Sequence, residues 1–108
     1  MKLLIVTSLK EYLPAISEML KQAQIAVFSV SKTTGMKTAD VSNLLDDWFG
    51  SHSGEFDSIF VFSFTSGDAA VKALELMEEY NRINNTDFPI RAFILPVEQT
   101  SQSPSKMK

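Results

Sequence analysis

The order of apolar patterns along the chain constrains the fold most, because short β-prone runs alternate with helical stripes. Apolar or alternating runs predict four strands, at residues 2–9, 25–32, 58–65 and 90–97. Helical spacing of apolar residues predicts amphipathic helices over 11–24 and 68–84. Two βαβ units in this order predict an α+β, ferredoxin-like βαββαβ sandwich. Its four strands form one antiparallel sheet, with the two long helices on one face.

The stretch between the second and third strands, residues 33–57, is the longest connection in the chain. It opens with Thr33-Thr34-Gly35, whose residue types are typical of a turn. A full amphipathic stripe follows, which predicts a short extra helix made by Val41, Leu44, Leu45, Trp48 and Phe49. Connections in compact domains are usually about 4–6 residues long, so a connection of this length indicates a function.

Composition limits the class of protein. The 108 residues are enough for one domain, which we place at 1–98, and residues 99–108 have no periodicity and are predicted to form a flexible tail. There is no cysteine, which excludes disulfides and thiolate chemistry. The net charge of −3 argues against nucleic acid as a partner. No apolar run is long enough to insert into a membrane, and we expect a cytoplasmic protein.

The third predicted strand carries apolar side chains on both faces. Phe60, Phe62 and Phe64 share one face, while Ile59 and Val61 share the other. Two helices cover only one face of a ferredoxin-like sheet, and an open face exposed to water should be polar. Because this face is apolar, we predict that it is buried between subunits of a homotrimer.

Two short motifs carry a resemblance to a known family. The last strand and its exit read Arg91-Ala92-Phe93-Ile94-Leu95-Pro96-Val97-Glu98, and the second strand runs through Ser29-Val30-Ser31-Lys32 into Thr33-Thr34-Gly35. In these motifs and in the order of its elements, the chain over residues 1–98 resembles the nitrogen-regulatory P-II signalling proteins of the GlnB-like superfamily. The resemblance implies a regulatory trimer that binds a small effector at the clefts between subunits.

The resemblance also implies roles for individual residues. The effector-binding residues would be Gly35, Lys37 and Arg91. Residues 33–57 would correspond to the T-loop, through which the family acts on a partner, either a membrane transporter or an enzyme. The implied partner contacts in this segment are Leu45, Trp48 and Phe49.

The sequence departs from the family where adenine nucleotide would bind. P-II proteins hold phosphates with a glycine-rich, lysine-containing loop before the last strand, and here that connection, Asn84–Pro89, has neither residue type. Phosphate needs backbone N–H groups in an open turn and basic side chains, so we predict weak or absent ATP binding and leave the cofactor open. Tyr12 and Tyr80 fall on the predicted long helices, which argues against uridylylation of a T-loop tyrosine.

Catalytic and metal-binding patterns are weak. His52 is the only histidine, and we interpret it as a solvated loop residue that could hold a metal only with ligands from other subunits. The adjacent pairs Asp46-Asp47 and Glu78-Glu79 point in different directions on a helix and do not form paired catalytic carboxylates. We therefore predict no enzyme. The alternatives that stay open are a CutA-like metal-tolerance protein and a small ferredoxin-fold enzyme.

Overall fold

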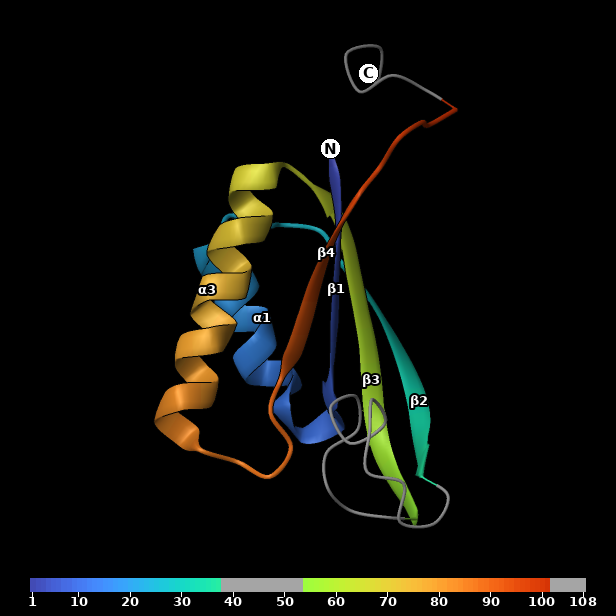
Figure 1. Ribbon diagram of the computed structural model, residues 1–108, viewed down its shortest axis with the longest axis vertical. Coiled ribbons are helices and arrows are strands. Elements are labelled where there is room, and N and C mark those ends of the chain that lie inside the picture. The colour runs from blue at the N-terminus through green and yellow to red at the C-terminus, as the bar shows by residue number, and fades with distance from the viewer. Residues whose placement is uncertain (38–53, 102–108) are drawn as a thin grey trace.

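The computed structural model describes residues 1–37 and 54–101, which form an antiparallel sheet with both helices on one face (Figure 1). Along the chain the elements are β1 Lys2–Leu9, the 3₁₀ turn η1 Lys10–Tyr12, α1 Leu13–Gln22, β2 Ser29–Lys37, β3 Gly54–Thr65, α3 Gly67–Asn84 and β4 Arg91–Pro96. The strand order is β2-β3-β1-β4, and each neighbouring pair is antiparallel. This topology confirms the predicted ferredoxin-like fold.

The helix ends follow local sequence signals. Pro14 lies in the first turn of α1, where its missing N–H costs no helical hydrogen bond. Ser66 caps α3, since its Oγ accepts a hydrogen bond from the Ala69 N–H at 3.2 Å. At the other end of α3, Asn85 has a left-handed backbone conformation with φ of 46° and ends the helix.

The core lies between the sheet and the two helices. Its most deeply buried members are Leu4, Val6, Ile16, Leu20, Ile59, Val61, Ala70, Ala73 and Met77. The small side chains of Ala70 and Ala73 let α3 lie close to its neighbours. Val71, next to Ala70 in α3, points away from this face and is 48% exposed. Ala73 and Met77 lie three and seven residues after Ala70, on the same side of the helix, and are buried with it.

The second strand differs from its predicted range. It spans Ser29–Lys37, and Thr33-Thr34-Gly35 belong to the strand and not to a turn. The interpretation as a turn was wrong because these residues pair with β3, where Thr33 Oγ1 and Ser58 Oγ share a hydrogen bond of 2.6 Å. Since β3 also begins early, at Gly54, the connection between the strands is residues 38–53. The predicted extra helix lies outside the described residues.

The strands end at different levels, which creates an open corner in the sheet. β1 ends with Leu9 opposite Ser58, whereas the β2–β3 ladder continues to Lys37 opposite Gly54. On the other side of β1, β4 begins with Arg91 opposite Thr7, so Ser8 and Leu9 have no partner in β4. Figure 1 shows β2 and β3 running past the end of β1.

Candidate functional site

The face of the sheet opposite the helices carries a row of phenylalanine rings. Phe60, Phe62 and Phe64 alternate along β3, and the ring centroids of successive pairs are 6.0 and 6.4 Å apart. The cross-strand register places Ile5 beside Phe62, and Phe93 on the other side of Ile5. Phe64 is 59% exposed. The open face is thus apolar, as the sequence predicted.

A pocket of about 200 Å³ lies at one end of this face, at the open corner of the sheet. It is lined by Thr7, Ser8, Leu9, Thr33, Thr34, Phe56, Ser58, Ile59, Phe60, Phe88 and Pro89. None of these described lining residues is charged or carries an acid or a base. The pocket therefore offers aromatic surface and hydroxyl groups.

The hydroxyl groups of the pocket differ in whether they are already hydrogen-bonded. Ser8 Oγ donates to the Leu9 carbonyl at 2.8 Å, and the hydroxyls of Thr33 and Ser58 bond to each other. Thr7 is only 8% exposed, and its Oγ1 is buried without a hydrogen-bond partner. A buried hydroxyl without a partner costs about 1–3 kcal/mol, and Thr7 Oγ1 carries this cost because almost none of its surface is open to solvent.

Two aromatic rings form one side of the pocket. Phe56, on β3, meets Phe88, from the loop before β4, edge to face with centroids 5.5 Å apart. The Phe56 ring lies over Gly35 of the neighbouring strand. A Cβ at Gly35 would come within 2.3 Å of this ring, so only glycine leaves room for it.

The loop that presents Phe88 is fixed by side chains. Asn81 binds Ile90 twice: its Nδ2 donates to the Ile90 carbonyl at 2.7 Å and its Oδ1 accepts from the Ile90 N–H at 2.8 Å. Thr86 Oγ1 accepts from the Phe88 N–H at 3.1 Å and shares a hydrogen bond of 2.7 Å with the Tyr12 hydroxyl. The N–H groups of Phe88 and Ile90 are therefore already in use.

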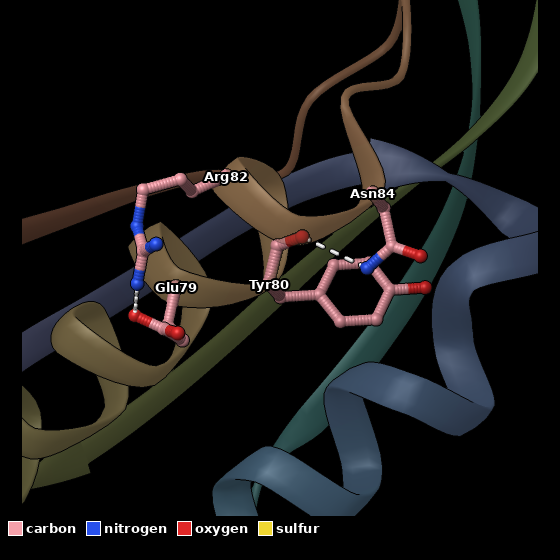
Figure 2. A network of polar contacts seen from close by, with 4 residues as sticks. All are labelled: Glu79, Tyr80, Arg82 and Asn84. Atoms are coloured by element: carbon pink, nitrogen blue, oxygen red, sulfur yellow. Dashed lines mark hydrogen bonds and ion pairs between the residues drawn. The ribbon is translucent and has the colours of Figure 1, made fainter.

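Polar contacts also hold the last turns of α3, just before this loop. Figure 2 shows Arg82 paired with Glu79. It also shows the Asn84 Nδ2 donating to the Tyr80 carbonyl, a hydrogen bond of 2.8 Å. The ring of Tyr80 meets that of Tyr12 edge to face, with centroids 6.3 Å apart. The ring contact ties the end of α3 to η1, just before α1, whereas the two polar contacts lie within α3 itself.

Two of the sequence-predicted site residues lie at the margin of the pocket. Gly35 supports Phe56, and Arg91 is paired with Thr7 in the β1–β4 register, although neither Gly35 nor Arg91 lines the pocket. Lys37 is the last residue of β2, opposite Gly54. The predicted partner contacts Leu45, Trp48 and Phe49, and the weak metal candidate His52, lie outside the described residues.

Sequence reasoning missed the residues that build the pocket, above all Thr7, Phe56, Ser58 and Phe88. A weak signal was present, because the apolar first strand contains the polar pair Thr7-Ser8 just before its last residue, and an aromatic residue precedes Pro89. In the part of the chain that the structure describes, no group of three or more histidine, cysteine or acidic side chains could hold a metal ion. Over the same residues, no helix is long and apolar enough to cross a membrane.

Comparison with known proteins supports the predicted resemblance through the fold. No protein-family model and no curated protein matches the chain. Among solved structures, it is similar to a crystal structure described as that of a PII-like signaling protein from Thermus thermophilus. The TM-score is 0.59 at 14% sequence identity, covering 86% of this chain and 82% of that one. The protein therefore has the fold of a PII-like signalling protein.

Proposed function

We propose that the protein is a PII-like regulatory module, which binds a small effector in the pocket and acts on a partner protein through residues 33–57. One observation carries this proposal: Phe56 forms a wall of the pocket and also belongs to the part of β3 that leads out of the 38–53 connection. A ligand against Phe56 would thus act directly on one end of that connection. Such a switch requires the ligand to bind two arrangements of the segment with different affinity.

The partner contacts remain a proposal that rests on the sequence. Leu45, Trp48 and Phe49 are large apolar residues at helical spacing, and such residues act as anchors in grooves of partner proteins. By resemblance to the family, the partner would be a cytoplasmic enzyme or the cytoplasmic side of a membrane transporter. A regulatory role is favoured over catalysis because the pocket is lined by hydroxyls and aromatic rings, with no acid or base to move a proton among its described lining residues.

The assembly that we propose is a homotrimer closed by the open sheet faces. Phe62, Phe64 and Leu95 lie on this face, and Phe64 and Leu95 are 59% and 41% exposed. Burying a side chain of this size contributes about 1.5–3 kcal/mol. Since the pocket opens on the same face, it would lie at the cleft between subunits.

The test of the assembly is the mass in solution. Light scattering of the wild-type protein should give three times the 12.0 kDa of one chain at micromolar concentration. Phe62→Lys should give monomers with an unchanged circular dichroism spectrum, because it places a charge in the centre of the open face. The matched control is Val71→Lys, on the outer surface of α3, which should stay trimeric. A wild-type monomer would overturn the proposal.

The test of signalling uses Trp48, the only tryptophan. Its fluorescence reports on the connection between β2 and β3. A ligand that raises the melting temperature of the trimer should also shift the Trp48 emission. Emission that stays constant while the ligand stabilises the protein would show that the pocket and the connection are not coupled.

A further inference from the structure

We propose that Phe56 is a latch: its ring holds the two-stranded end of β2 and β3 against the loop before β4, and the arrangement of this end changes when the ring leaves its seat on Gly35. This inference rests on the proposed function, in which the connection between β2 and β3 acts on a partner. It names the contact that would separate the two arrangements that such a switch requires.

The two-stranded end, residues 34–37 of β2 and 54–57 of β3, extends beyond the other strands. β1 ends opposite Ser58, and β4 begins opposite Thr7. Among the described strands, residues 54–57 of β3 therefore pair only with β2. A ribbon of two strands is by itself only marginally stable in water. A side-chain contact to the rest of the domain thus has a large influence on where this end lies.

Phe56 contacts the loop before β4 through its ring. The rings of Phe56 and Phe88 meet edge to face, with centroids 5.5 Å apart and an angle of 62° between their planes. Phe88 is itself held in place, because its N–H donates to Thr86 Oγ1 at 3.1 Å and Thr86 Oγ1 also shares a hydrogen bond with the Tyr12 hydroxyl. Since Tyr12 lies in η1, the ring of Phe56 joins the two-stranded end to a loop that is anchored on the body of the domain.

Gly35 provides the seat for the ring. It lies directly opposite Phe56 in the β2–β3 register, and it is buried, whereas every other residue of β2 from Ser29 to Met36 is exposed. A Cβ at Gly35 would come within 2.3 Å of the ring, so the ring occupies the space that a side chain would fill. A glycine within a strand weakens the strand, and an aromatic side chain on the neighbouring strand compensates for it. Removal of the ring from this position would therefore uncover Gly35 and loosen the ladder at the base of the connection.

The latch is weak enough to be released. An edge-to-face pair of rings favours the contact by only about two- to ten-fold beyond the effect of the area that it buries. A ligand or partner that prefers one arrangement by a similar factor would change the proportion of the two arrangements substantially. Because Phe56 is half-buried and lies outside the core cluster, its ring can leave Gly35 without opening the core between the sheet and the helices.

NMR spectroscopy tests the position of the ring. The ring current of Phe56 displaces the resonance of the Gly35 Hα protons, and Phe56→Leu gives the value of this resonance without the ring. Phe88→Leu keeps an apolar side chain but removes the edge-to-face partner, so we expect the ratio of seated to unseated rings to fall by about two- to ten-fold. The Gly35 resonance should then move toward its value in Phe56→Leu. Phe88→Tyr keeps a ring at this position and should retain the wild-type resonance.

Two further variants and a second signal complete the test. Thr86→Val removes the hydroxyl that anchors Phe88, tests the same contact independently, and should move the Gly35 resonance in the same direction as Phe88→Leu. The matched control is Phe64→Leu, which removes a similar ring contact at the far end of β3 and should leave the Gly35 resonance unchanged. The Trp48 emission of the ligand-free protein should shift in Phe88→Leu and not in Phe64→Leu.

Other results would overturn the inference. A Gly35 resonance that is the same in the wild type and in Phe56→Leu would show that the ring does not occupy its seat. A resonance that Phe88→Leu and Thr86→Val leave unchanged would show that the loop does not hold the ring. Constant Trp48 emission in a variant whose Gly35 resonance moves would show that the ring does not set the arrangement of the connection. In these cases a trimeric mass and a ligand-dependent Trp48 emission of the wild type would still support the regulatory module, whereas a monomer with constant emission would end the proposed function as well.

Discussion

The two faces of the sheet are built by the same strands but differ in how their side chains are covered. On the helix side, Leu4, Val6 and Val61 are at most 1% exposed and pack against α1 and α3. On the open side, Phe62 is half-buried and Phe64 is 59% exposed, and these rings pack against each other along β3. One face is thus completed within the chain, while the other leaves large apolar groups in contact with water.

This difference separates folding from function in the molecule. The helix-covered face supplies the buried apolar area that stabilises a single chain. The open face adds less to the stability of one chain, yet it carries the pocket and the surface that we propose for assembly. Substitutions on the two faces should therefore have different consequences.

The largest loss of stability is expected from a substitution on the helix-covered face. Leu4→Ala removes three carbon atoms from a site that is 1% exposed. We expect it to lower the free energy of unfolding by about 2–5 kcal/mol, because the lost burial is combined with a cavity. Urea denaturation measures this value. A loss below about 1 kcal/mol would mean that this face is not the main source of stability.

An intermediate loss of stability is expected at the margin of the pocket. Gly35→Ala should lower the free energy of unfolding by about 1–3 kcal/mol, because the new Cβ would lie 2.3 Å from the Phe56 ring and displace it. The matched control is Gly67→Ala, where an added Cβ meets only the Lys2 side chain, at 3.9 Å. Urea denaturation of both variants tests this difference. If they have the same stability, Phe56 is not held against Gly35.

The smallest effect on the stability of one chain is expected on the open face. Phe64→Ser removes a ring that is 59% exposed and contacts Phe62 edge to face. At concentrations where the chain is monomeric, we expect a loss of less than about 1 kcal/mol. The same urea measurement at low protein concentration checks it. A loss as large as that of Leu4→Ala would remove the distinction between the two faces.

The features that sequence reasoning predicted depend on local periodicity. The order of the elements and the shared face of Phe60, Phe62 and Phe64 follow from spacing within a few residues. Such patterns survive folding because alternation in a strand and a repeat of 3.6 in a helix directly set which side chains face the core. The overall fold could therefore be predicted.

The features that it missed depend on partners distant in sequence. Gly35 is typical of a turn when considered with its neighbours, and its place in a strand becomes clear only from the Phe56 ring that covers it. The pocket likewise depends on Thr86, which Tyr12 holds from the other end of the chain. No local pattern encodes these contacts. The apolar open face could be predicted, but the pocket at its end could not.

The extension of β2 and β3 beyond the end of β1 has a consequence for the dynamics of the molecule. At Ser58, β3 passes from two hydrogen-bonded neighbours to one. Between Gly54 and Asp57, β3 pairs with β2 alone, so opening this part of the ladder breaks fewer hydrogen bonds and exposes less apolar surface than opening the part from Ser58 onward. Amide hydrogens from Gly54 to Asp57 should exchange with solvent faster than those from Ile59 to Ser63. We therefore expect this two-stranded end of β2 and β3 to open and close many times while the rest of the sheet stays folded, and the buried core to stay packed throughout.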